Sequence, residues 1–232
     1  MTVIDRFKFE DEGYDFPFYN KNPYIPKWGW VVLFVAFIAG TLLAVISENL
    51  PLIILGCIVF IVPVLYFLKW DYKAIFRKPS RRDILLAVAL FIGYFVYAMV
   101  MEAILKQFGI VSNGPISQES VTVMTLFTSI FSLMGEEFLK FIPFMFFLRV
   151  IYKFSNNRKL SVIISMLIVM AMFAYMHSFN PALFLFALCI QGFGSIFEFY
   201  GYIKTKSIWV PYLSHLFTDY FIFIIILLGF NI

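Results

Sequence analysis

The chain has 232 residues, of which 62% are hydrophobic and only 14% are charged. A soluble domain of this length carries about 25% charged residues and about half apolar ones, so the composition excludes an ordinary soluble protein. The sequence therefore predicts an integral protein of a lipid bilayer, and the positions of its charges matter more than its net charge of +4.

Residues 1–26 are polar and aromatic, and they lack the short apolar core of a cleavable signal peptide. They are predicted to form a cytoplasmic tail that either lies at the membrane interface or is disordered. Residues 27–232 are predicted to form a single transmembrane domain that begins with an uncleaved anchor. Cys57 and Cys189 both fall in apolar runs, which favours buried free thiols over a disulfide or a metal site.

Seven stretches of about 20 apolar residues follow the tail, and this is the length needed to cross a hydrocarbon core about 30 Å thick. They lie at 27–46, 49–70, 83–105, 120–150, 159–178, 181–203 and 208–230. Apolar and polar residues do not alternate with a period of two, so helices are predicted rather than an outer-membrane barrel. The expected fold is an all-α transmembrane helix bundle with seven or eight crossings. Its 120–150 helix is long enough to be tilted, or to be broken near Gly135.

The basic residues alternate with the predicted crossings. Sixteen of the 18 Lys and Arg residues lie in the tail, at Lys27 directly after it, or in the connections 69–82, 149–159 and 204–206. The positive-inside rule puts these segments and the N-terminus on the cytoplasmic side. A nucleic-acid-binding patch would not alternate with each crossing, so no nucleic-acid partner is predicted. With no targeting feature in the sequence, a multi-pass protein of a bacterial plasma membrane is favoured.

A few polar residues fall inside the predicted spans, where a charge costs about 2.5–3.5 kcal/mol. They include both histidines of the protein and are Glu136, Glu137, Lys140, His177, Gln191, Glu198, His215 and Asp219. Lys140 follows the two glutamates by three and four residues, and Asp219 follows His215 by four, so each set shares a helix face. Such a set could activate water, with Glu as general base and His as proton donor or oxyanion partner. The alternative is a neutralised cluster that fixes helix packing, and Glu198, close to Lys204, fits a structural role as well as a functional one.

Three short motifs occur in order along the second half of the chain. They are Glu136-Glu137, the FAYMH sequence from Phe173 to His177, and the HLFTD sequence from His215 to Asp219. Their order, together with the run GYIKTKSIWVPYLSHLFTD, resembles the CAAX protease and bacteriocin-processing family (CPBP, also called Abi) over about residues 120–225. Members of that family are intramembrane glutamate endopeptidases. The resemblance implies a peptide-bond hydrolase that forms no acyl-enzyme intermediate.

Carried over residue by residue, the resemblance implies that Glu136 is the general base and Glu137 its companion. It implies that His177 orients the catalytic water, and that His215 and Asp219 stabilise the oxyanion. An ionised Asp219 cannot donate a hydrogen bond, so it would have to be protonated or act by orienting His215. The supporting residues are predicted to be Lys140, Phe173 and Glu198.

The first motif departs from the family pattern. The family has Glu-Glu-x-x-x-Arg, which would place Arg at position 141, whereas this chain has Phe141 and a cation one residue earlier, Lys140. Glu-Glu-x-x-Lys is similar to the first motif of the related PrsW group, which lacks the Phe-x-x-x-His motif. Lys also lacks the bidentate fork of Arg. Either the role of the cation has moved by one position, or the site is altered and inactive.

Two histidines and a carboxylate can hold zinc, but the helical His-Glu-x-x-His spacing is absent, so catalysis without a cofactor is predicted. The expected substrate is a peptide or a membrane-anchored protein, in bacteriocin processing or immunity or in the maturation of a signal peptide. Phe141 keeps open an alternative, a catalytically silent scaffold that binds a membrane protein partner. A lesser alternative is a small proton-coupled transporter that uses Glu136, Lys140 and His177 as a relay, although the chain shows no repeat of the transporter kind.

Overall fold

The computed structural model describes residues 6–20, 23–111 and 121–229. Helices make up 76% of it, and no strand occurs in the described residues, which confirms the all-α expectation. Parts of the predicted tail (1–5 and 21–22) and the end residues 120 and 230 of two predicted spans lie outside these ranges. The α-helices are α1 (Lys27–Gly40), α2 (Leu50–Phe67), α3 (Arg81–Gln107), α4 (Val123–Ser155), α5 (Arg158–His177), α6 (Pro181–Ala187), α7 (Ile196–Thr205) and α8 (Trp209–Leu227).

Six helical stretches are long and apolar enough to cross a membrane. They are Lys27–Val45, Leu50–Phe67, Arg81–Gln107, Arg158–His177, Leu183–Thr205 and Trp209–Leu227. The remaining predicted span is α4, which has 33 residues and carries Glu136, Glu137 and Lys140 near its middle. By length and composition, the chain is a multi-pass membrane protein.

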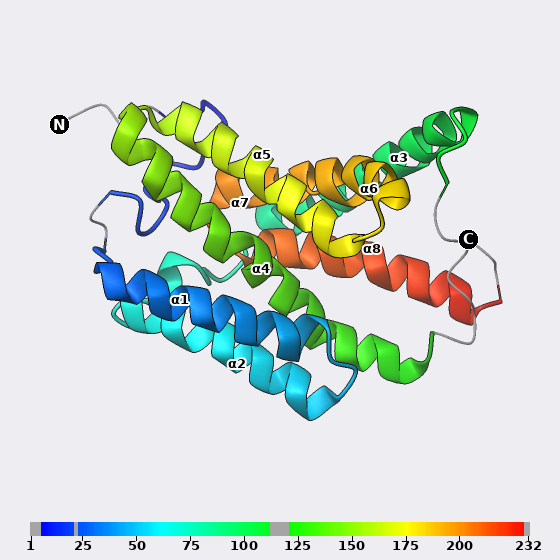
Figure 1. Ribbon diagram of the computed structural model, residues 1–232, viewed down its shortest axis with the longest axis horizontal. Helices are drawn as coiled ribbons and strands as arrows, with labels where there is room; N and C mark the ends of the chain where they lie inside the picture. The colour runs from blue at the N-terminus through cyan, green and yellow to red at the C-terminus, as the bar shows by residue number, and fades with distance from the viewer. Residues whose placement is uncertain (1–5, 21–22, 112–120, 230–232) are drawn as a thin grey trace.

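The central element of the bundle is α4, which contacts α1, α2, α5 and α8. In Figure 1, α1 and α2 lie side by side along one flank, and α4 runs between this hairpin and the remaining helices. Helix α5 packs along α4, and α3 packs along α8. The connection from α6 to α7 includes a π-helical turn, Leu188–Gly192. This arrangement surrounds the middle of α4 with α5, α7 and α8, the helices that carry the other predicted site residues.

Helix α4 is unbroken along its whole length, so the break considered near Gly135 does not occur. Gly135 instead allows α4 to approach the first hairpin closely, because a Cβ atom there would lie 2.8 Å from the Cβ of Ala44. Pro143 is also accommodated within the helix. The helix ends at Ser155, and the next residue, Asn156, adopts the left-handed conformation (φ 49°) common at helix C-termini.

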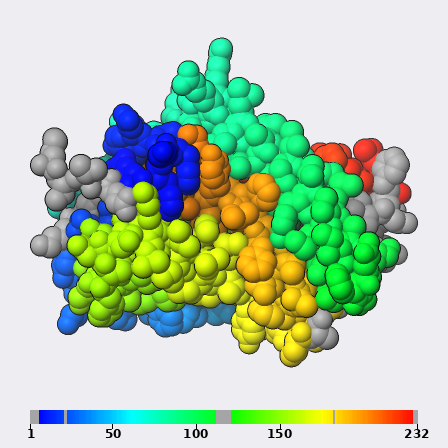
Figure 2. Space-filling model, turned by 90° about the horizontal axis from the view of Figure 1, so that it is seen from above, coloured from blue at the N-terminus to red at the C-terminus, as the bar shows by residue number. Residues whose placement is uncertain are grey.

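The described part of the N-terminal tail folds against one end of the bundle (Figure 2), where it lies between α7 and the α4–α5 turn. Phe16 and Phe18 are completely buried. The Phe16 ring lies 5.6 Å from that of Phe144 on α4 and 5.8 Å from that of Tyr202 on α7. The tail therefore contributes core residues to the bundle.

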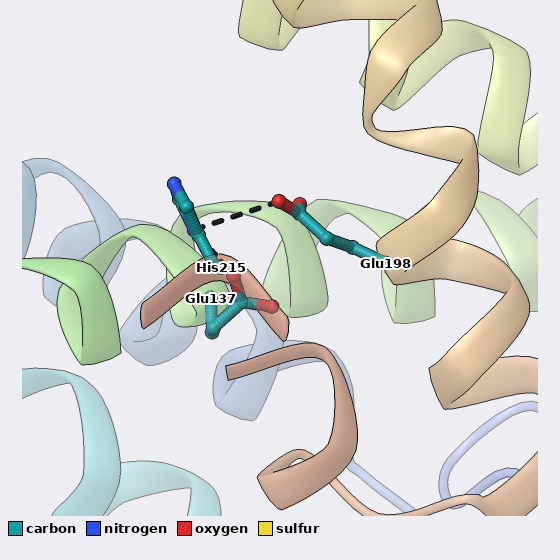
Figure 3. A group of neighbouring side chains, drawn as sticks. All are labelled: Glu137, Glu198 and His215. Carbon is teal, nitrogen blue, oxygen red and sulfur yellow. Dashed lines mark hydrogen bonds and ion pairs between the residues drawn. The ribbon is translucent and has the colours of Figure 1, made fainter. Parts of the chain in front are cut away.

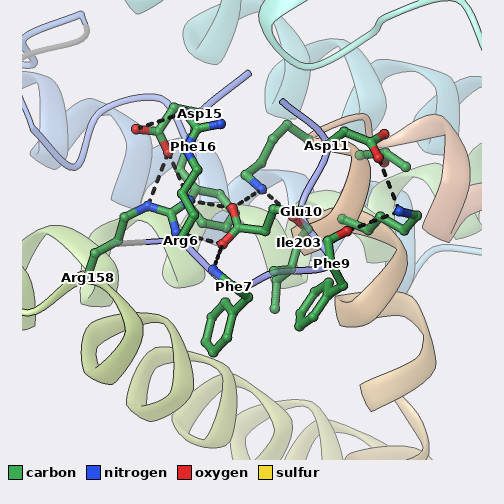
Figure 4. Close-up of polar contacts among 12 residues, drawn as sticks. Arg6, Phe7, Phe9, Glu10, Asp11, Asp15, Phe16, Arg158 and Ile203 are labelled. Carbon is green, nitrogen blue, oxygen red and sulfur yellow. Dashed lines mark hydrogen bonds and ion pairs between the residues drawn. The ribbon is translucent and has the colours of Figure 1, made fainter. Parts of the chain in front are cut away.

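The centre of the tail is a buried ion-pair cluster (Figure 4), in which Glu10 binds two cations. Arg158 donates to both carboxylate oxygens of Glu10 at 2.7 and 2.6 Å, and Lys206 donates to one of them at 2.6 Å. Arg158 also donates to Asp15 at 3.0 Å. Burial by itself raises the pKa of Glu10, but the hydrogen bonds from Arg158 and Lys206 outweigh it and lower the pKa from 4.5 to about 2.

Replacing Glu10 by glutamine is expected to lower the free energy of unfolding by about 3–5 kcal/mol at neutral pH, because buried Lys206 loses its carboxylate partner and Arg158 loses one of its two. The pKa of Glu10 is lower in the folded protein than its ordinary value of 4.5, so its stabilising effect is complete above that pH. The effect is lost as the pH falls toward 2, and the variant should lack this dependence. Melting temperatures in detergent at pH 7 and pH 3 would measure both effects. The exposed Glu12→Gln is the control, and equal melting temperatures for the two variants would contradict the assigned role.

Candidate active site

Five segments of the bundle place polar side chains around one cavity of about 320 Å³. The cavity lies among α3, α4, α5, α8 and the stretch from the π-helical turn to α7. The polar residues that line it include Glu136, His177, Gln191, Glu198, His215 and Asp219. Six of the eight polar residues predicted within the spans, including both histidines of the protein, thus meet in one place.

Beside this cavity, two carboxylates hold an ammonium group and an imidazole (Figure 3 shows the carboxylates and the imidazole). Lys140 Nζ donates to Glu137 Oε1 at 2.7 Å, and it also donates to the carboxylate of Glu198. His215 Nδ1 lies 3.0 Å from the same Glu137 oxygen and 3.6 Å from Glu198 Oε1. The side chains of Glu137 and Lys140 are only 4% and 5% exposed. Glu137 is therefore fixed from both sides.

The neighbouring carboxylate, Glu136, has a different environment. Its side chain lines the cavity and is 19% exposed, and it makes no hydrogen bond with any residue that the structure describes. The nearest cationic group is His215, whose Nε2 atom lies 3.9 Å from Glu136 Oε2 and also 3.9 Å from Asp219 Oδ1. The carboxylate of Glu136 is thus free to bind a water molecule, whereas that of Glu137 is not.

His177 is the last residue of α5, and the preceding turn of that helix sets its tautomer. Its Nδ1 atom lies 2.9 Å from the carbonyl oxygen of Phe173. A carbonyl can only accept, so Nδ1 carries the proton and Nε2 of the neutral ring is left as an acceptor. The Phe173 ring packs on the imidazole with centroids 4.4 Å apart, and Lys140 Nζ lies 4.8 Å from the centroid of the same ring. The Phe173 ring thus contacts both His177 of the second motif and Lys140, which follows the first motif on α4.

Phe141 takes no part in the cavity. Its ring packs against those of Phe138 and Tyr202, with centroids 5.7 and 5.6 Å away. The cation of this region is Lys140, one residue earlier on α4, and it bridges two carboxylates. A positive charge is therefore present in the site although the arginine of the family pattern is not.

Replacing Lys140 by methionine is expected to lower the free energy of unfolding by about 3–5 kcal/mol, because Glu137 and Glu198 would be buried without a counterion. Thermal unfolding in detergent would measure the loss. The matched control is Lys106→Met, at an exposed position on α3. Equal melting temperatures for the two variants would show that Lys140 does not neutralise the buried carboxylates.

Among the residues that the structure describes, one group of side chains could bind a metal ion, and it consists of Glu137, Glu198 and His215, whose ligand atoms all lie within 4.8 Å of one another. Two carboxylates and an imidazole are a suitable donor set for zinc. However, the ammonium group of Lys140 already contacts both carboxylates. A divalent cation would have to displace this buried ammonium, so the residues present do not fit a metal ion.

Sequence reasoning left Glu198 open between two roles and did not single out Tyr94. Glu198 lies only six residues before Lys204, yet its carboxylate contacts Lys140 and approaches His215. Tyr94 reaches the cavity from α3. A tyrosine in an apolar helix gives no signal of its own, because its largely apolar ring fits a membrane-spanning segment without any catalytic role.

Residues 118–221 match the family model described as type II CAAX prenyl endopeptidase Rce1-like. The matched segment includes the first two motifs, the π-helical turn and both residues of the His215–Asp219 pair. Comparisons with curated proteins and with solved structures found no match. The Rce1-like proteins are intramembrane proteases. Residues 118–221 are thus similar to the Rce1-like membrane proteases, which belong to the CPBP family, and by its helices the chain is a multi-pass membrane protein.

Proposed function

We propose that the chain is a metal-free intramembrane endopeptidase in which Glu136 activates water for attack on a peptide bond. The observation that carries this proposal is the unequal use of two adjacent glutamates. Glu137 is held by Lys140 and His215, whereas Glu136 lines the cavity without a hydrogen-bond partner among the described residues. A general base must be free to bind the water from which it takes a proton.

In the proposed reaction, water binds between Glu136 and Nε2 of His177 and gives its proton to Glu136. The oxygen attacks the carbonyl carbon of the substrate and forms a tetrahedral oxyanion. His215 in its imidazolium form donates from Nε2 to the oxyanion, and the carboxylates around the ring stabilise the positive charge. Asp219 keeps this nitrogen in position. Glu136 then passes the proton to the leaving nitrogen, and the C–N bond breaks without an acyl-enzyme intermediate.

The proposed substrates are peptides or membrane-anchored proteins, in bacteriocin processing or immunity or in the maturation of a signal peptide. We place the protein in a bacterial plasma membrane with its N-terminus in the cytoplasm, in accord with the distribution of its Lys and Arg residues.

The rival function is that of a silent scaffold that binds a membrane protein, and Phe141 is the observation in its favour. The buried cation at Lys140 favours the enzyme, because it supplies the charge that Phe141 lacks.

The experiment is to reconstitute the protein in lipid vesicles and to supply a library of fluorophore–quencher peptides. Cleavage is expected, and neither EDTA nor 1,10-phenanthroline should slow it. Added hydroxylamine should yield no hydroxamate product, because no acyl-enzyme is present to be trapped. Inhibition by chelators that zinc reverses would overturn the metal-free mechanism. A protein that cleaves nothing but co-purifies with a membrane partner would be the scaffold.

A further inference from the structure

Gln191 is a polar residue of the membrane-spanning region that the proposed mechanism leaves unused. It lines the same cavity as Glu136, His177 and His215. Its Oε1 atom is buried and has no hydrogen-bond partner among the described residues. Leaving an amide unpaired in an apolar interior costs free energy. Such a group in a cavity implies a ligand that satisfies it.

The backbone around Gln191 is held in a special conformation. The residue belongs to the π-helical turn Leu188–Gly192, and the extra residue of such a turn rotates the neighbouring side chains by about 100° relative to a regular α-helix. Tyr97 on α3 donates a hydrogen bond to the Cys189 carbonyl at 2.5 Å. On the other side, a Cβ atom at Gly192 would lie 2.9 Å from the Cβ of Ala174 on α5. The turn is therefore clamped between two helices.

We infer that Gln191 binds the backbone of the substrate, with its side-chain amide paired to one peptide group. This inference rests on the proposed function, since the ligand is the peptide to be cleaved. Oε1 would accept from the peptide N–H, and Nε2 would donate to a neighbouring carbonyl. A peptide backbone carries both groups, and a peptide in this cavity would need partners for them, because the surrounding helices leave few polar groups to pair with. Ser195 cannot take this role, because its hydroxyl already donates to the Gly192 carbonyl at 2.6 Å.

The pairing selects for the conformation of the substrate rather than for its side chains. The N–H and carbonyl groups inside an α-helix are already bonded to one another, so they cannot pair with Gln191. An extended segment leaves both groups free. The substrate class is therefore a peptide that is extended, or a membrane helix that has unwound, where it reaches the cavity.

The test measures binding separately from cleavage. The probe is the library peptide that the wild type cleaves fastest, with copies in which one N–H at a time is replaced by an ester oxygen. Binding is measured on Glu136→Gln protein, which retains the cavity, with and without Gln191→Met. The methionine is similar in size and cannot form the pair. We expect Gln191→Met to raise the Kd about 10- to 100-fold. One ester copy should bind correspondingly weakly to the protein that retains Gln191, and it should lose no further affinity in the Gln191→Met protein.

Stability provides the second measurement, because a structural role predicts the opposite result. Removing a buried, unpaired amide oxygen should leave the melting temperature unchanged or raise it, whereas loss of a structural hydrogen bond would lower it. Gln107→Met, at an exposed position on α3, is the control. Cleavage by the wild type together with an unchanged Kd for Gln191→Met would overturn this inference and leave the proposed function standing. A wild type that cleaves no peptide would overturn both.

Discussion

Replacing Glu136 by glutamine is expected to lower kcat for peptide cleavage by about 10²–10⁴-fold, because an amide cannot take the proton of the attacking water. Folding should be unaffected, since Glu136 makes no hydrogen bond with a described residue and lies 3.9 Å from the nearest cationic nitrogen in its surroundings. The measurements are initial rates in vesicles and melting temperatures in detergent. An exposed glutamate on α3, Glu102, provides the control Glu102→Gln.

Replacing the adjacent residue, Glu137, tests whether the roles given to the two glutamates are reversed. Glu137→Gln should lower the melting temperature as well as the rate, because it weakens the contacts to Lys140 and His215. If Glu136→Gln instead cleaved at the wild-type rate while Glu137→Gln was folded and inactive, the general base would be Glu137. The two roles given to the glutamates would then have to be exchanged.

Replacing His215 by leucine is expected to lower kcat by about 10²–10³-fold, the usual effect of removing one donor to an oxyanion. KM should change little, because the donor acts on a charge that exists only in the transition state. Steady-state kinetics on the cleaved peptide would separate the two constants. The chain has only two histidines, so His177→Leu is the natural comparison. A change confined to KM would show that His215 binds the ground state of the substrate and not the oxyanion.

The helices could be predicted closely from the sequence because hydrophobic length is a local property. The span predicted at 83–105 is observed as Arg81–Gln107, and that at 208–230 as Trp209–Leu227. The ends are also local, since Ser80 and Asp83 form a capping box at the start of α3. Within the predicted 181–203 span, the short α6 and the π-helical turn were not foreseen, because nothing in their composition differs from that of a continuous helix.

Most of the polar residues that gather at the cavity could be predicted, but not the contacts among them. Spacings of three and four residues place side chains on one helix face, and the high cost of burying charge selected the same residues. Which of two adjacent glutamates meets Lys140 and His215 depends on how α4 is rotated against α7 and α8. That rotation is set by packing across the bundle, such as the contact of Gly135 with Ala44.

The tail illustrates the same limit over a longer distance. Its interleaved charges and aromatic rings fit an interfacial segment as well as a packed one. The partner that buries Glu10 is Arg158, 148 residues further along the chain. No local pattern predicts such a pair.

The buried cluster at Glu10 also couples the tail mechanically to the proposed chemistry. Arg158 is the first residue of α5, whose last residue is His177, and Lys206 immediately follows α7, which carries Glu198. Because a helix is stiff, a shift at Arg158 or Lys206 would move the part of α5 or α7 that lines the cavity. Undocking the tail would remove the ion pairs that hold these ends of α5 and α7 at the same time. The position of His177, which we propose orients the catalytic water, would then depend on whether a segment near the start of the chain is docked.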